Sequence, residues 1–82
     1  MRVTLKPGVR RALSERLPAS VADQMYNELA VNPLRVGKPL SEPWAGHLGA
    51  RVGPVWRVIY RVEGDVVEVV KVGHRADVYR PS

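Results

Sequence analysis

The chain has 82 residues, and this length predicts one domain covering residues 1–82. Its 45% of hydrophobic residues is too high for a disordered chain, and no apolar run reaches the roughly 18 residues of a membrane span. The absence of cysteine excludes disulfides and thiolate chemistry and suits a cytoplasmic location, while the net charge of +5 indicates an anionic partner.

The first part of the chain predicts a strand and two helices. Residues 1–6 alternate between apolar and polar side chains, as a half-buried strand does. Apolar residues then recur at helical spacing from Val9 to Leu17, and Pro18 ends this helix. A second amphipathic helix follows, with Ser20 as its expected N-cap. Two short helices are marginal alone, so we expect them to pack on a sheet.

The middle of the chain concentrates the positive charge. Residues 32–62 hold five basic residues and one acidic residue, which gives +4. Residues 32–45 contain three prolines, and we expect an irregular segment there. Arg35 and Lys38 in this segment are either solvated surface cations or phosphate contacts for a nucleic acid.

Three strands are predicted at residues 46–52, 55–62 and 66–72. Short turns containing Gly53 and Gly64 join them, so they form an antiparallel meander. Helices on one face of such a sheet give an α+β fold. The first strand adds to this sheet at a position that the sequence does not fix.

Side-chain alternation assigns the two faces of the sheet. Trp56, Val58 and Tyr60 share one face and are expected to form the core under the helices. The opposite, open face then carries a row of basic and imidazole side chains: His47, Arg51, Arg57 and Arg61. This face suits a phosphate-bearing ligand.

Four stretches of the sequence, taken together, resemble the RelE/ParE superfamily of type II toxin–antitoxin toxins, most of all its RelE branch. These stretches are Asn32 to Leu40, Gly46 to Arg51, Trp56 to Val62 and Gly73 to Tyr79. The resemblance implies a microbial-ribonuclease-like fold of order β-α-α-β-β-β. It also implies metal-independent cleavage of mRNA in the A site of the 70S ribosome. The implied partner is an acidic antitoxin that wraps and neutralises the toxin.

The resemblance also implies the catalytic residues. It assigns Arg57, Arg75 and Tyr79 to the reaction, whereas the two lysines that well-studied RelE toxins carry on the second strand are replaced here by Arg51, with His47 nearby. Arginine can hold the charge of a pentacoordinate phosphorane but is a poor proton-transfer group. Proton transfer is then left to Tyr79 or to His74, because imidazole exchanges protons near neutral pH. Tyr79 can alternatively stack on an RNA base.

Two other functions remain open on the same scaffold. One is inhibition of DNA gyrase, as in ParE-like toxins, and the other is a catalytically weak relative that only binds an antitoxin or RNA. Two histidines without cysteine make a poor metal site, so no metal or cofactor is expected.

Overall fold

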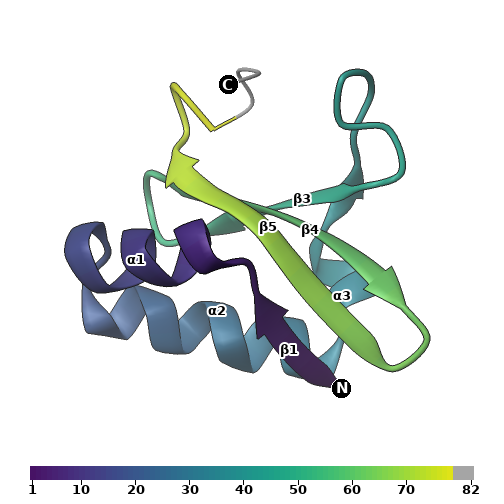
Figure 1. The fold of residues 1–82 in the computed structure, drawn as a ribbon, viewed down its shortest axis with the longest axis horizontal. Helices are drawn as coiled ribbons and strands as arrows, with labels where there is room; N and C mark the ends of the chain where they lie inside the picture. Colours follow the sequence, from purple (N-terminus) through teal and green to yellow (C-terminus); the bar gives the residue numbers. More distant parts are fainter. Residues whose placement is uncertain (79–82) are drawn as a thin grey trace.

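The computed structural model describes residues 1–78, and in it two helices cover one face of a five-stranded sheet (Figure 1). This confirms the predicted α+β class. The helices are α1 (Pro7–Arg16), α2 (Ala19–Val31) and the short α3 (Pro33–Val36). The strands are β1 (Arg2–Leu5), β2 (Lys38–Pro39), β3 (Leu48–Val52), β4 (Trp56–Glu63) and β5 (Val66–His74). Within residues 1–78, no helix has the length and apolarity needed to cross a membrane.

Helices α1 and α2 form because their apolar residues fall on one stripe. Val9 and Leu13 of α1 and Met25 and Leu29 of α2 are buried. The predicted N-cap at Ser20 is wrong, because α2 begins at Ala19, two residues earlier than an N-cap at Ser20 requires. Pro18 takes the N-cap position without a side-chain hydrogen bond, which leaves Ser20 exposed in the first turn.

The strand order is β1-β5-β4-β3-β2, and β3, β4 and β5 form the predicted antiparallel meander. Gly53 and Gly64 take φ values of 64° and 60° in the two tight turns, a conformation that glycine adopts without strain. The position of β1, which the sequence left open, is at the sheet edge, parallel to β5. The long connection that a parallel pair needs contains the three helices and the strands β2, β3 and β4.

The segment predicted to be irregular contains α3 and β2 and is anchored to the core. The Tyr60 hydroxyl, fully buried, donates a hydrogen bond to the Pro33 carbonyl. Gly37 lies so close to the Tyr60 phenol that a side chain there would overlap the hydroxyl oxygen. The core therefore fixes the path of this segment, and with it the position of Lys38 on β2.

We expect the buried Tyr60 to make stability depend on alkaline pH. Burial raises the pKa of Tyr60 to about 12, and the Gly37 backbone N–H offsets part of the rise. The pKa of Tyr60 in the folded state lies above the ordinary value of 10.0. The neutral Tyr60 hydroxyl therefore contributes its full stabilisation of the folded state below pH 10, and this stabilisation is lost as the pH rises towards 12. Urea denaturation should show a steeper decline over this interval for the wild type than for Tyr60→Phe. Parallel declines in the two proteins would contradict this prediction.

The register confirms the predicted faces of β3 and β4. Ala50, Val58 and Tyr60 are buried in the core, and Arg51 and Arg57 lie opposite each other on the other face. A β-bulge in β5, at the register shift between Ile59 and Tyr60 of β4, leaves Val70 without a partner. The bulge changes the alternation of β5.

Candidate functional site

The centre of the candidate site is a pair of arginines on the face away from the helices. Arg57 on β4 lies directly opposite Arg51 on β3 and opposite Gly73 on β5. Arg57 is half-buried, and its Nη1 donates to the Trp56 carbonyl at 3.5 Å. Like charges placed directly opposite each other on neighbouring strands destabilise a sheet. A bound anion would reduce the repulsion between Arg51 and Arg57 and so stabilise this arrangement.

A third cation joins this pair in a pocket of about 510 Å³. Lys38 on β2 lies opposite Gly49, two residues before Arg51 on the same strand. The pocket is lined by Val36, Lys38, Leu40, Gly49, Ala50, Arg51 and Arg57. Its described lining holds three cations and no carboxylate, and none of the three forms an ion pair with another residue in the range 1–78. We call it the basic pocket.

The chain after β5 turns back over the same face. Arg75 is exposed, and its backbone N–H donates to the Val55 carbonyl at 2.7 Å, which holds it beside the β3–β4 turn. The N–H groups of Asp77 and Val78 both donate to the His74 carbonyl. Val78 is 1% exposed and packs against Gly73, the cross-strand neighbour of Arg57. Arg51, Arg57 and Arg75 thus share one end of the sheet.

The expectation of a fully open face needs a correction. Ile59 has the same alternation as Arg57, yet it is 0% exposed and lies outside the main core cluster. The loop between β2 and β3 and the segment after β5 both rise on this side of the sheet (Figure 1). This face is therefore partly covered and not fully open.

His74 does not join the basic pocket. It lies opposite Trp56, and the two rings are in edge contact with centroids 6.1 Å apart, on the face that the helices cover. Its Nδ1 accepts a hydrogen bond from the Ala76 N–H at 3.1 Å. The structure thus brings Arg57 and Arg75 to one end of the sheet but places the His74 ring on the other face.

The remaining predicted contacts are spread over the molecule. Arg61 is neutralised by Glu68 at 2.9 Å and Glu63 at 3.7 Å, so its charge is already partnered. Arg35 is exposed on α3 and does not line the basic pocket. His47 lies in the β2–β3 loop, with Nδ1 3.4 Å from the Ala45 carbonyl. Tyr79 lies outside the described residues.

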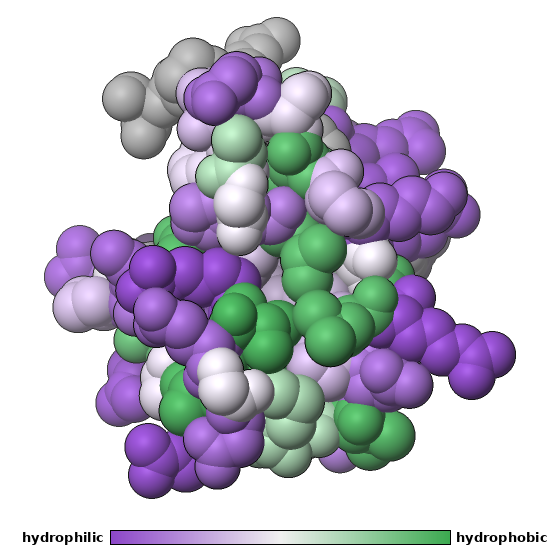
Figure 2. Space-filling model, turned by 90° about the vertical axis from the view of Figure 1, so that its right-hand side faces the viewer, coloured by the Kyte–Doolittle hydropathy of each residue, from purple (hydrophilic) through white to green (hydrophobic). Residues whose placement is uncertain are grey.

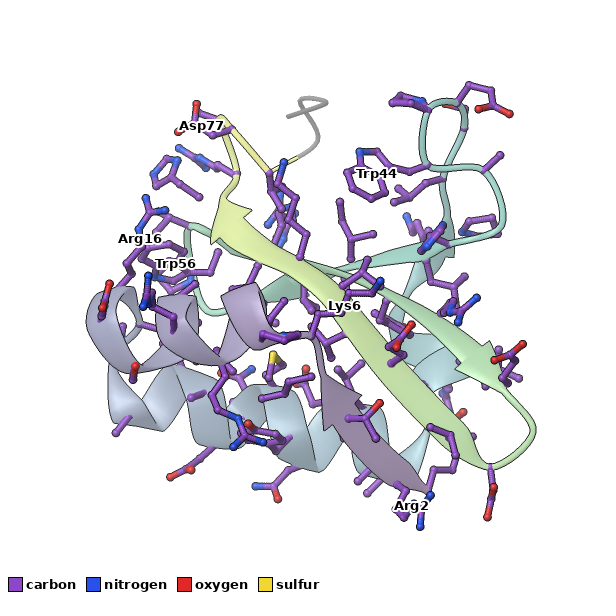
Figure 3. The ribbon with its side chains drawn as sticks, viewed as in Figure 1. Arg2, Lys6, Arg16, Trp44, Trp56 and Asp77 are labelled. Atoms are coloured by element: carbon purple, nitrogen blue, oxygen red, sulfur yellow. The ribbon has the colours of Figure 1, made fainter. Side chains whose placement is uncertain are left out.

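Trp44, which the sequence analysis did not single out, lies in the loop between β2 and β3. Its ring projects from the β2–β3 loop towards the middle of the sheet (Figure 3). The Lys71 Nζ lies 5.6 Å from the ring centroid, a cation–π contact between the loop and β5. The sequence did contain a signal for this residue. Trp44 lies in the proline-rich residues 32–45, which have no core of their own to bury a large ring.

Comparison with known families decides the family of the chain. Residues 9–79 match the family described as the ParE toxin of type II toxin–antitoxin system, parDE. The chain belongs to this family of toxins. The resemblance to the RelE/ParE superfamily is thereby confirmed.

The relatives of this toxin include members named for the RelE branch. Toxin RelG of Mycobacterium tuberculosis is 41% identical over 70 residues, which are 83% of this chain and 79% of that protein. Toxin RelE of the same organism is 33% identical over 70 residues, 83% of this chain and 71% of that protein.

Solved structures agree on the fold of the toxin. The toxin–antitoxin complex RelBE2 from Mycobacterium tuberculosis matches with a TM-score of 0.77 and 36% identity, over 90% of this chain and 96% of that one. The YoeB/ParE toxin from Agrobacterium tumefaciens matches with a TM-score of 0.72 and 17% identity, over 90% of this chain and 98% of that one. The second likeness concerns the fold alone.

Proposed function

We propose that this toxin is a ribosome-dependent, metal-independent endoribonuclease that cleaves mRNA in the A site of the 70S ribosome. The observation that carries the proposal is the basic pocket, in which Lys38, Arg51 and Arg57 converge without a described carboxylate. Such a cluster suits the phosphate of an RNA backbone, because it supplies charge for two or more phosphate oxygens. The kinship with toxins named RelE and RelG supports the same choice. The expected place of action is the cytoplasm.

The reaction requires charge stabilisation and two proton transfers. The ribose 2′-oxygen attacks the neighbouring phosphorus, a bond to phosphorus forms, and the bond to the leaving 5′-oxygen breaks. We assign the phosphorane charge to Arg57 and Arg75, whose guanidinium groups stay protonated throughout. Tyr79 is our candidate for proton transfer. His74 is the weaker candidate for this role, because its ring lies on the helix-covered face opposite Trp56.

We also propose a cognate antitoxin as the protein partner. The solved relatives include toxin–antitoxin complexes, RelBE2 among them. The basic face of the sheet favours an acidic antitoxin segment. Two large apolar side chains, Val31 at the end of α2 and Leu34 in α3, are 82% and 68% exposed and can contribute apolar contacts to a partner. Figure 2 shows hydrophobic side chains gathered among hydrophilic ones on one side of the molecule.

A second candidate function is inhibition of DNA gyrase. Two observations favour it: the family description names ParE, and β3 carries only one basic residue, Arg51. A binding-only relative without either activity is the third possibility.

Primer extension on mRNA from cells that express the toxin tests the proposal. We expect new 5′ ends within translated codons for the wild type and at least about tenfold fewer for Arg75→Ala, because that side chain contributes charge at the scissile phosphate. Plasmid supercoiling is measured in the same cells. Growth arrest with relaxed plasmids and intact mRNA would instead establish the gyrase function. Normal growth with intact mRNA would leave a binding-only protein.

A further inference from the structure

A second pocket, of about 430 Å³, lies beside the Trp44 ring. The start of α1 and the bulged part of β5 form the rest of its wall. It is lined by Lys6, Pro7, Gly8, Val9, Ala12, Trp44, Val70, Lys71 and Val72. This pocket, which we call the Trp44 pocket, shares no lining residue with the basic pocket.

The chemistry of the Trp44 pocket combines one aromatic ring, two ammonium groups and an apolar floor. Lys6 and Lys71 supply the charge, and the described lining contains no carboxylate. An aromatic ring flanked by cations is the arrangement that single-stranded nucleic acids recognise by base stacking. Recognition of acidic peptide motifs relies instead on arginine clusters, and the cations here are lysines.

The loop that carries Trp44 is held in place by its own backbone. The backbone N–H of Trp44 donates to the Ser41 carbonyl at 2.9 Å, and the backbone N–H of His47 donates to the Trp44 carbonyl at 3.0 Å. The backbone N–H of Leu40 donates to the His47 carbonyl at 3.1 Å. The edge contact with the His47 ring, with centroids 5.7 Å apart, and the Lys71 ammonium orient the indole further. A ring positioned before the ligand arrives loses little entropy on binding.

The strand register relates the Trp44 pocket to the basic pocket. Lys71 lies opposite Ile59, and Ile59 lies opposite Gly49, which lines the basic pocket. Two strand spacings separate Lys71 from Gly49, roughly 10 Å. Neighbouring nucleotides of one extended RNA strand can therefore reach the two pockets together.

We propose that the Trp44 pocket is a base-stacking subsite for an unpaired RNA nucleotide next to the phosphate held in the basic pocket. The base stacks on the Trp44 indole, and Lys6 and Lys71 hold the phosphate of that nucleotide. This inference rests on the proposed function in that RNA is the ligand, but it does not require cleavage.

The chain contains two tryptophans, which allows a direct test. In a Trp56→Phe variant, Trp44 is the sole tryptophan, and a short 2′-O-methyl oligoribonucleotide, which cannot be cleaved, should quench its fluorescence saturably. The matched Trp44→Phe variant, which reports only from Trp56, should show no quenching. Unchanged Trp44 fluorescence while a dye-labelled oligonucleotide binds, as judged by its anisotropy, would overturn the proposal. So would quenching by a polyglutamate peptide and not by RNA.

Substitutions at Trp44 measure how much the indole ring contributes to oligonucleotide affinity. Trp44→Ala should weaken oligonucleotide binding by about five- to hundredfold, the range expected for one stacked base. Trp44→Phe should keep most of the affinity, and Lys71→Ala should weaken binding severalfold. Circular dichroism verifies the fold of each variant. Equal affinities for wild type and Trp44→Ala would reject the subsite.

The outcomes separate this inference from the proposed function. Quenching of Trp44 by RNA without mRNA cleavage in cells supports the subsite and rejects the nuclease. Cleavage that depends on Arg75 but occurs without Trp44 quenching rejects the subsite and keeps the nuclease.

Discussion

An Arg57→Ala toxin is expected to cleave ribosome-bound mRNA about 10²–10³-fold more slowly than the wild type, the loss seen when one preorganised donor to a developing anion is removed. Arg57 is half-buried and is held by the Trp56 carbonyl, so its guanidinium is oriented before RNA arrives. Lys38 and Arg51 line the same pocket, but they lie on other strands, so we expect neither to replace the Arg57 guanidinium. The measurement is the single-turnover rate on purified ribosomes programmed with mRNA.

The same strand offers a matched control. Arg61 lies on β4 with the same outward direction as Arg57, but Glu68 and Glu63 neutralise it. Arg61→Ala should change the rate by no more than about twofold, since exposed ion pairs contribute little. The cleavage rate of Arg57→Lys should lie between those of the wild type and Arg57→Ala, because lysine keeps the charge but lacks the planar guanidinium that binds two oxygens at once. Equal losses for Arg57→Ala and Arg61→Ala would show that net charge alone matters.

Gly37→Ala is expected to be the most destabilising single-methyl change in residues 1–78. The added Cβ would overlap the Tyr60 hydroxyl oxygen and lie 3.2 Å from the Leu48 Cβ. Tyr60 cannot move aside, because it is 0% exposed and bonded to the Pro33 carbonyl. Overpacking of this kind costs about 1–3 kcal/mol, and each kcal/mol lowers the Tm of so small a domain by about 4–8 °C. Calorimetry or urea denaturation measures the loss.

Gly8→Ala is the control for the Gly37 prediction. A Cβ at Gly8, in the first turn of α1, meets nothing within 4 Å. The free energy of unfolding should therefore be unchanged or slightly higher, because alanine favours the helix. Combining Gly37→Ala with Tyr60→Phe should restore part of the lost stability, since the hydroxyl that causes the overlap is gone. A Gly37→Ala protein as stable as Gly8→Ala would contradict the steric account.

The sequence predicted the faces of β3 and β4 correctly because the signal there is local. Apolar residues alternate with Arg51 and Arg57, and a period of two identifies the core face without tertiary information. The same reasoning did not find the bulge at Val70. A run of valines gives β5 two apolar faces, so its alternation carries no register information.

Other features depended on contacts between distant residues. The Trp44 ring meets Lys71 from a proline-rich loop, a contact that no local period encodes. Ile59 has the same alternation as Arg57, yet it is fully buried on a face that the sequence predicted to be open. The tertiary fold, and not local propensity, decides such positions.

The parallel pairing of β1 with β5 has a consequence for the synthesis of this toxin. Arg2 pairs with Val66 and Leu5 pairs with Val69, so the first strand has no partner until residues 66–69 have left the ribosome. Such non-local pairing delays folding, because a long loop must close first. Arg57 lacks its β5 neighbour even longer, because Gly73 is translated after residues 66–69. The nascent toxin therefore completes the basic end of its sheet only after most of β5 has been translated.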